Sequence, residues 1–160
     1  MNLGLSKVLK EAFPHIIPVK RPNKSEENIP DPNWISGFSG AEGCFDIKKV
    51  NLKSRLQVQP RFRISQHERD RALLGIIMGY LKCGTLQISR NTVELTVVKY
   101  DDILNIIIPF FDKYPIFGEK QLDFKDFKSV VYLLKEKNLT DENLEKILEI
   151  KVGMNTGRTK

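Results

Sequence analysis

The stretch from Trp34 to Gly43 (Trp-Ile-Ser-Gly-Phe-Ser-Gly-Ala-Glu-Gly) constrains the fold of this 160-residue chain more than any other segment. Asp31-Pro32 before it is a typical helix start, and Gly43 is a typical helix stop. A helix over residues 32–42 would contain two glycines, each of which costs about 1 kcal/mol relative to alanine. The sequence therefore predicts a helix whose small residues serve a purpose, and a poorly formed glycine-rich turn is the alternative.

The small residues of this segment are spaced so that they share one face of the predicted helix. Ser36 and Gly40 stand four residues apart, as do Gly37 and Ala41, so both pairs lie on adjoining parts of one helix surface. A surface of hydrogens and methyl groups lets the backbone of another helix approach closely. We therefore expect these four residues to form a helix–helix interface.

Glu42 is predicted to lie at the C-terminal end of this helix, where the helix dipole already places partial negative charge. If two such helices pack side by side, their two carboxylates meet near a shared axis and repel. A divalent cation would offset that repulsion, and oxygen ligands favour ions of the magnesium type. The alternative is a frayed helix end with a solvated glutamate.

The rest of the chain predicts one α+β domain. Alternating polar and apolar residues indicate four strands, and apolar residues at helical spacing indicate helices between and after the strand pairs. A short helix at 4–12 and a proline-punctuated linker form an arm (residues 1–30) before the main domain (residues 31–160). The simplest architecture is an antiparallel sheet backed by helices. The predicted strands are 44–50, 57–65, 84–89 and 92–98, and the predicted helices are 68–81, a segment from 101 that Pro109 ends or kinks, 122–136 and 142–152.

Each predicted strand divides into an apolar and a polar face, because strand side chains alternate. Glutamine, arginine, lysine, threonine and serine dominate the polar, outer face. The apolar face is predicted to hold Phe45, Ile47, Val58, Phe62, Ile64, Leu86, Ile88, Leu95 and Val97. The outer face is predicted to hold Asp46, Lys48, Gln57, Gln59, Arg61, Arg63, Ser65, Thr85, Gln87, Ser89, Glu94 and Thr96.

The outer face has a chemistry suited to reading bases in the major groove of DNA. Arginine can bind guanine, glutamine can bind adenine, and a carboxylate can accept a hydrogen bond from the amino group of cytosine. On that basis Arg61 and Arg63 suit guanine, and Gln59 and Gln87 suit adenine. A plain solvated face is the alternative, although glutamate and lysine would then be expected to predominate.

The positive charge of the chain is concentrated in the same region. The net charge is +6, from 26 basic and 20 acidic side chains. Residues 44–99 hold 11 lysines and arginines against 4 acidic residues, a net +7, so the remainder carries −1. A basic surface can serve solubility alone, but this distribution together with the strand pattern favours a nucleic-acid partner.

Other classes of site have little support in the sequence. Cys44 and Cys83 are far apart and there are only two histidines, which argues against a zinc site. Reduced, buried thiols suit an intracellular protein. No apolar run approaches the roughly 20 residues that a membrane span needs. The residues after Met1 lack the pattern of a secretory signal.

The segment from Ile35 to Gly43 resembles the LAGLIDADG motif of homing endonucleases and related intron maturases. The likeness extends over roughly residues 30–157 and includes the ααββαββα order of that family, which implies a curved four-stranded sheet. Gly40 departs from the motif, since many members have an acidic residue there. The motif matches are strongest at Gly37, Phe38, Ala41, Glu42 and Gly43. The segments most similar to fungal organelle-intron members are Phe62-Arg63-Ile64-Ser65-Gln66-His67 and Lys120-Gln121-Leu122-Asp123-Phe124.

The resemblance implies roles for three residues. Glu42 would be the metal-binding acid, Gln66 would help to order the water network, and Lys120 would stabilise charge or assist proton transfer. The cofactor would be Mg²⁺ or Mn²⁺, while Ca²⁺ would bind without supporting cleavage. A basic residue is also expected about one turn after Gln66, where this chain has Asp70 between two arginines, so that role stays unassigned.

A single motif predicts a twofold homodimer on a roughly palindromic site, because family members with two motifs are about twice as long. Met1-Asn2-Leu3-Gly4 is also similar to Met154-Asn155-Thr156-Gly157, and residues 2–30 resemble the tail of a first repeat plus a linker. We therefore also hypothesise that the chain is the C-terminal half of a two-repeat enzyme, acting as a homodimer.

The resemblance implies a site-specific endonuclease for double-stranded DNA that leaves short 3′ overhangs and has a mitochondrial origin. A non-cleaving nucleic-acid-binding half module or a splicing maturase is the alternative. A structural interaction domain would leave the basic strands unexplained. The presence of Glu42, Gln66 and Lys120 together favours cleavage.

Overall fold

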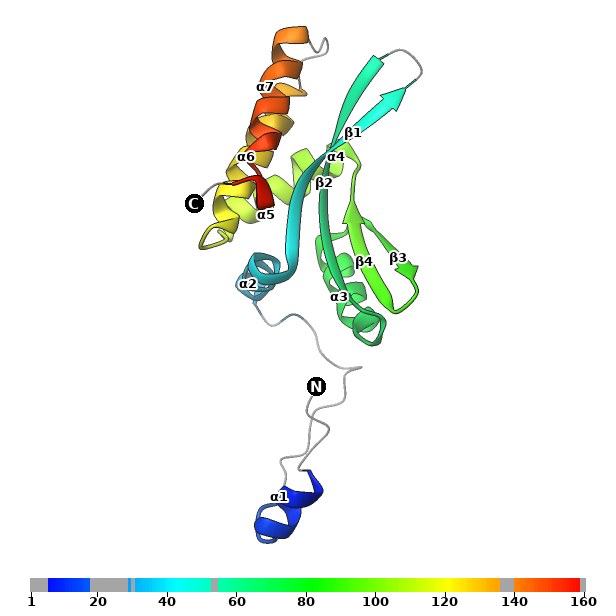
Figure 1. Ribbon diagram of the computed structural model, residues 1–160, viewed down its shortest axis with the longest axis vertical. Helices are drawn as coiled ribbons and strands as arrows, with labels where there is room; N and C mark the ends of the chain where they lie inside the picture. The colour runs from blue at the N-terminus through cyan, green and yellow to red at the C-terminus, as the bar shows by residue number, and fades with distance from the viewer. Residues whose placement is uncertain (1–5, 18–28, 30, 53–54, 136–139, 159–160) are drawn as a thin grey trace.

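The computed structural model describes residues 6–17, 29, 31–52, 55–135 and 140–158. Its main body is a four-stranded antiparallel sheet with helices against one face and the other face open (Figure 1). The strands lie in the order β1-β2-β4-β3. They are β1 (Gly43–Leu52), β2 (Arg55–His67), β3 (Thr85–Ser89) and β4 (Thr92–Val97). The helices are α1 (Lys7–Ala12), α2 (Pro32–Glu42), α3 (Arg71–Leu81), α4 (Tyr100–Asp102), α5 (Ile108–Lys113), α6 (Lys120–Leu133) and α7 (Asp141–Val152), with short turns η2 (Glu68–Asp70), η3 (Ile103–Ile107) and η4 (Asn155–Gly157).

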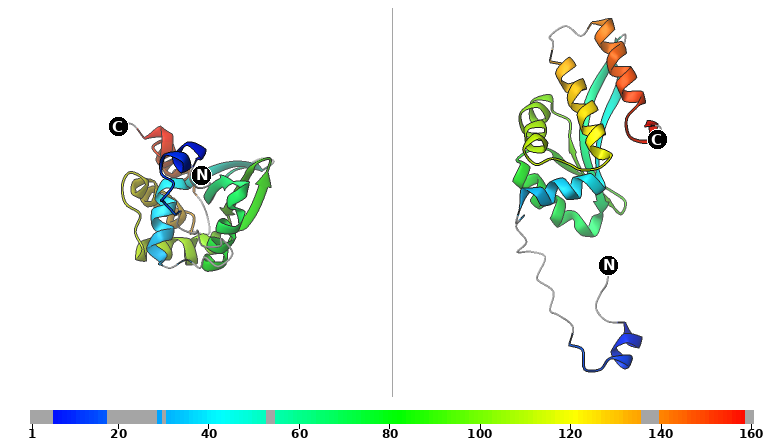
Figure 2. Two further views of the ribbon diagram at one scale, coloured as in Figure 1. Left: turned by 90° about the horizontal axis from the view of Figure 1, so that it is seen from below. Right: turned by 90° about the vertical axis from the view of Figure 1, so that its left-hand side faces the viewer.

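The predicted α+β architecture and its element order are confirmed. Helix α6 packs against β1, and α3 packs against β2, β3 and β4, so both helices cover one face of the sheet (Figure 2). The structure extends β2 beyond its predicted end to His67, which brings Gln66 into the strand. In addition, α6 begins at Lys120, about half a turn earlier than predicted. Among the described residues, no helix has the length and apolar character required to cross a membrane.

Pro109 does not end its helix, and the turn just before it is not a regular α-helical turn. The chain is helical from Tyr100 to Lys113, and η3, just before the proline, is a π-helix. Proline lacks an N–H group and its ring collides with the carbonyl one turn earlier in a regular helix. A widened π-helical turn accommodates both effects, so the helix continues for four residues beyond Pro109.

The core is organised around Phe45, which is fully buried on the inner face of β1. Its ring lies 5.0 Å from the ring of Phe62 on β2, 5.4 Å from that of Phe111 and 5.3 Å from that of Phe124, measured between centroids. Strand and helix layers therefore meet in one aromatic cluster, and the apolar face predicted for β1 and β2 is confirmed.

The apolar face predicted for β3 is only partly covered. Leu86 packs against the core, but Ile88 is 44% exposed. Strand β3 lies at the edge of the sheet, and the helices behind the sheet do not extend over its end. Alternation in the sequence marks which side a residue faces, whereas burial depends on what lies opposite it.

We predict that Phe45→Ala lowers the free energy of unfolding by about 3–5 kcal/mol, because it leaves a cavity in the aromatic cluster. Urea unfolding followed by circular dichroism would measure the change. Phe117→Ala is the matched control, since Phe117 is 82% exposed, and it should change the stability by less than about 0.5 kcal/mol. Equal effects of the two substitutions would contradict the assigned core.

Candidate active site and DNA-facing surface

The junction between α2 and β1 contains no loop. Helix α2 ends at Glu42 and β1 begins at Gly43, whose N–H donates to the carbonyl of Ser39. A Cβ atom at Gly43 would overlap that same carbonyl oxygen, so only glycine allows the chain to turn directly from helix into strand here. The junction leaves Glu42 exposed at the end of the helix.

The four residues predicted to form a helix–helix interface divide into two pairs. Gly37 and Ala41 are exposed. Ser36 is only 2% exposed, and its hydroxyl donates to the Tyr114 carbonyl at 2.6 Å, so it packs inside its own subunit. A Cβ atom at Gly40 would meet a side chain of the same subunit at 3.5 Å, which places Gly40 beside the body of the domain. The exposed strip is therefore narrower than predicted.

Aromatic residues complete this exposed strip. Trp34 and Phe38 stack with their ring centroids 5.0 Å apart, and Trp34 is 39% exposed. We call Trp34, Gly37, Phe38 and Ala41 the α2 face. A Cβ atom added at Gly37 would have no neighbour within 4 Å among the described residues. The α2 face is thus apolar, with Trp34, Gly37 and Ala41 exposed and Phe38 packed partly against the core of the domain.

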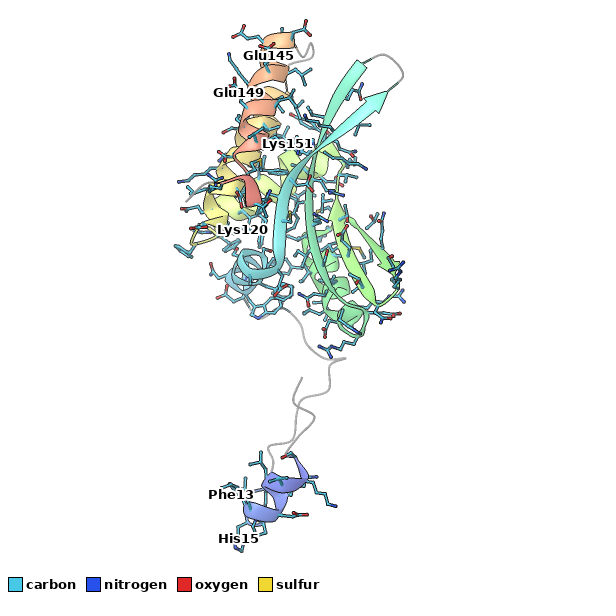
Figure 3. The ribbon with its side chains drawn as sticks, viewed as in Figure 1. Phe13, His15, Lys120, Glu145, Glu149 and Lys151 are labelled. Carbon is cyan, nitrogen blue, oxygen red and sulfur yellow. The ribbon has the colours of Figure 1, made fainter. Side chains whose placement is uncertain are left out.

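A cleft of about 710 Å³ opens beside the α2–β1 junction. Lys120, at the first turn of α6, points into the region between α6 and this junction (Figure 3). Gly40 and Cys44 also line the cleft, and they flank Glu42 in the sequence. The other lining residues are Asp46, Arg63, Phe117, Glu119, Asp123, Asn155 and Thr156.

The strand register brings Gln66 to the same end of the sheet. Gly43 pairs with Ile64, so Gln66 lies two residues past the start of β1, beside the end of α2. Glu42, Gln66 and Lys120 therefore come from three different elements, α2, β2 and α6, around the α2–β1 junction. Lys120 lines the cleft, whereas Glu42 and Gln66 are not among its lining residues. Gln66 pairs with the buried Val93 and lies on the same side of β2 as Ile64, the side that the helices cover. The basic residue expected about one turn after Gln66 is still unassigned. Arg69, one of the two arginines beside that position, lies 3.5 Å from the Asp70 carboxylate.

The residues predicted for the outer face do share one face of the sheet. Arg63 lies opposite Cys44 on one side and Thr96 on the other, and Glu94 lies between Ser65 and Gln87. Lys48 lies opposite Gln59, and Asp46 opposite Arg61. Thr96 is the exception in exposure, since it is 8% exposed, and its hydroxyl donates to Glu94 at 2.9 Å. The exposed side chains are Lys48, Gln57, Thr85, Gln87 and Ser89.

Ion pairs already hold the two central arginines of this face. The Arg61 guanidinium lies 2.6 Å from an Asp46 carboxylate oxygen. Arg63 lies between two acids, 3.6 Å from Asp46 and 3.3 Å from Glu94. The Nε atom of Arg63 is covered but donates no hydrogen bond within the described part of the chain. Both arginines are therefore fixed in position before any ligand arrives, which the sequence did not reveal.

Glu94 is the acceptor for three neighbouring side chains. The hydroxyls of Ser65 and Thr96 donate to it at 2.8 and 2.9 Å, and Arg63 donates at 3.3 Å. Burial alone would raise the pKa of Glu94, but these hydrogen bonds and the charge of Arg63 outweigh burial and lower it. Glu94 is thus held as a carboxylate in the middle of the outer face.

The two free cysteines differ in burial. Cys83 is buried, which raises the pKa of its thiol to about 11 and makes it unreactive. Cys44 is a free thiol but only partly buried, contrary to the prediction of two buried thiols.

No group of three or more histidine, cysteine, aspartate or glutamate side chains in the described residues could hold a metal ion.

The family model for LAGLIDADG endonuclease matches residues 35–131. The chain belongs to the LAGLIDADG endonuclease family. The matched region includes the exposed acid at the end of α2, the whole sheet and most of α6. The resemblance noted in the Ile35–Gly43 motif is therefore confirmed over more than half of the chain.

The relatives and solved structures that this chain resembles are longer than the chain itself. "Probable intron-encoded endonuclease 2" of Neurospora crassa is 42% identical over 94% of this chain and 35% of its own length. The I-SmaMI LAGLIDADG homing endonuclease bound to cleaved DNA is 37% identical, with a TM-score of 0.84 over 99% of this chain and 55% of that one. I-SmaMI bound to uncleaved DNA target in the presence of calcium ions is 38% identical, with a TM-score of 0.82 over 96% and 54%. The chain thus spans about a third of that curated relative and about half of the solved enzyme.

We predict that the stabilising effect of Glu94 is lost as the pH falls. Because folding lowers its pKa, its contribution is complete at pH values above the unfolded value, about 4.3, and disappears as the pH falls through the folded value. The difference in unfolding free energy between the wild type and Glu94→Gln should therefore be larger at pH 7 than at pH 3. Ser65→Ala, which removes one of the three donors, should reduce this pH dependence only in part. A difference independent of pH would show that the hydrogen bonds do not stabilise the carboxylate.

Proposed function

We propose that this domain is half of a site-specific double-stranded DNA endonuclease that works as a homodimer on a roughly palindromic site. The proposal is supported by the exposed Glu42 at the α2–β1 junction, with Lys120 in the adjoining cleft and Gln66 at the same end of the sheet. I-SmaMI, whose fold this domain shares, has been solved with cleaved DNA. The relatives are described as intron-encoded, which supports an organelle intron as the origin of the chain.

Each residue at the junction has a distinct task in the proposed reaction. The exposed Glu42 carboxylate supplies an oxygen ligand of the kind that Mg²⁺ and Mn²⁺ prefer. Such ions supply activation of a water and stabilisation of the leaving oxygen at the scissile phosphate. Gln66 can donate to and accept from water, so it orients solvent near the phosphate. Lys120 places a positive charge in the cleft, where it stabilises negative charge that develops on the phosphate.

The outer face of the sheet binds the DNA and reads its sequence. Exposed Gln57, Gln87 and Lys48 can reach base edges or phosphates directly. Arg61 and Arg63 are held by Asp46 and Glu94, so they present fixed donors and lose little conformational entropy on binding. Prepositioned donors favour recognition of a defined base sequence over general attraction to phosphate.

The α2 face is the surface on which a second copy packs in this proposal. It is apolar and largely exposed, and its small residues Gly37 and Ala41 allow the close approach that a helix–helix contact requires. A twofold axis along this face brings the two Glu42 carboxylates together at one end of the paired helices. The second acid supplies the ligands that a single domain lacks, and each sheet then reads one half of the DNA site.

We predict that Glu42→Gln abolishes cleavage while leaving DNA binding largely intact. A cleavable sequence would first be selected from a randomised duplex library in the presence of Mg²⁺. The amide keeps the size of the side chain but loses the charge, so the cleavage rate should fall by at least about 100-fold. Binding of the selected duplex, measured by fluorescence anisotropy, should change by less than about threefold. Normal cutting by the variant would show that Glu42 is not the metal-binding acid.

We predict that Gly37→Leu blocks self-association without destabilising the subunit. A leucine here finds open space in its own chain, but it would overpack a close helix–helix contact. Overpacking costs about 1–3 kcal/mol, which corresponds to about 5- to 150-fold weaker dimerisation. Sedimentation equilibrium at micromolar concentration would measure the effect.

Gly79→Leu is the matched control for that experiment. Gly79 is also an exposed helical glycine at which a Cβ atom has no described neighbour within 4 Å, but it lies on α3, away from the α2 face. The control should dimerise like the wild type. A wild-type chain that stays monomeric at micromolar concentration would contradict the homodimer.

A further inference from the structure

One residue bridges the two elements that carry Glu42 and Lys120. The Asn155 side-chain amide donates to the carbonyl of Phe45 on β1 at 2.9 Å, three residues after Glu42. The backbone N–H of the same residue donates at 2.9 Å to a carboxylate oxygen of Asp123 on α6, three residues after Lys120. Asn155 thus contacts both sides of the cleft at the same distance along the chain from each candidate catalytic residue.

The β1 side of the bridge holds the strand where it leaves the α2–β1 junction. Strand β1 is an edge of the sheet, so its outward carbonyls have no neighbouring strand. Asn155 supplies a donor for the Phe45 carbonyl, and its side-chain oxygen lies 3.8 Å from the Cys44 sulfur, within range of a weak S–H hydrogen bond. These contacts fix the first residues of β1, which follow Glu42 directly.

The α6 side of the bridge is a buried carboxylate. Asp123 is 5% exposed, and one of its oxygens accepts from Asn155 and, at 3.0 Å, from Arg158. The other oxygen lies 3.7 Å from the Lys120 ammonium. Arg158 also donates to Asp126 one turn further along α6, at 2.6 Å. The turn η4 is therefore attached to the same carboxylate that faces Lys120.

The backbone of Asn155 makes this double contact possible. Its φ angle is +53°, in the left-handed region that asparagine adopts more readily than most residues. This conformation lets the N–H point to α6 while the side chain points to β1. The same pattern, Met-Asn-x-Gly, recurs at residues 1–4 of the sequence, in the segment that resembles the tail of a preceding repeat.

We propose that Asn155 is a positioning residue that sets the placement of Glu42 relative to Lys120. The proposal rests on the proposed function, since it assigns a role within that active site. Asn155 does not itself act on the phosphate in this proposal. It keeps the acid of one element and the cation of another at a fixed separation, which reactions at a phosphate require because small errors in placement reduce the rate strongly.

The decisive variant is Asn155→Gly. Glycine adopts the left-handed backbone without strain and keeps the N–H that donates to Asp123, so only the side-chain contacts with β1 are lost. We expect the single-turnover cleavage rate of the preformed protein–DNA complex to fall by about 10- to 100-fold. The dissociation constant for the duplex, measured without divalent ions, should change by less than about threefold.

Two further variants separate the possible causes of that loss. Lys82→Gly is the matched backbone control, because Lys82 also has a left-handed φ of +55° but caps α3 outside the cleft. Its melting temperature should change little, because relief of the left-handed strain offsets the added entropy of the unfolded chain, and it should cleave like the wild type. Cys44→Ala removes only the weak sulfur contact, and it should keep most of the activity if the bond to Phe45 is the one that matters.

Amide hydrogen exchange gives a readout that needs no cleavage. In Asn155→Gly, exchange should become faster at residues 43–45 and 120–123, while β3 and β4 keep their protection. A variant that cleaves at the wild-type rate, or that loses binding and cleavage in parallel with uniformly faster exchange, would overturn the positioning role. A wild-type domain that cuts no duplex would refute the proposed function, whereas the exchange pattern would still show whether Asn155 couples β1 to α6.

Discussion

The direct passage from α2 into β1 is the constraint on which the rest of this domain depends. Because Gly43 allows the chain to turn without a loop, the exposed acid, the apolar strip of α2 and the first strand of the sheet form one rigid unit. Phe45, two residues after that turn, is the centre of the aromatic core. The position of Glu42 is therefore set by the best-packed part of the domain, as a reactive group requires.

The order of elements was predictable because each of them follows a local rule. Period-two alternation, an Asp-Pro helix start and a glycine stop depend on nearby residues, and all of them held. The residues that were missed form contacts across the chain. Asp123 and Asn155 are 32 residues apart, and no local pattern indicates that they meet. One indication of Asn155 was present in the sequence, the recurrence of Met-Asn-x-Gly at residues 1–4 and 154–157. That recurrence indicates a repeated feature, but it does not identify the residues that Asn155 contacts. Ser36 was misplaced for a similar reason, since its hydroxyl has a partner in Tyr114 that spacing on the helix could not reveal.

Acidic side chains hold basic side chains in place both on the outer face of the sheet and in the cleft. On the sheet, Asp46 and Glu94 neutralise part of the positive charge of the arginines, which weakens general attraction to phosphate. In the proposed function, such an arrangement would lower affinity for DNA of any sequence in favour of fixed donors for particular bases. In the cleft, the buried Asp123 shares its charge between Lys120 and Arg158, so that neither side chain is free to swing. In both places acidic side chains restrict the movement of arginine and lysine side chains.

The proposed homodimer is supported by what a single domain contains and what it lacks. A single domain has a complete sheet and a complete core, so reading of a half-site and folding need no partner. By contrast, it has one exposed acid, and among the residues described there is no cluster able to hold a metal ion. The surface next to that acid is apolar and largely exposed, which is unfavourable in water and favourable against another helix. In the proposed homodimer, folding and recognition would belong to each domain, whereas cleavage would belong to the contact between two and depend on assembly through the α2 face.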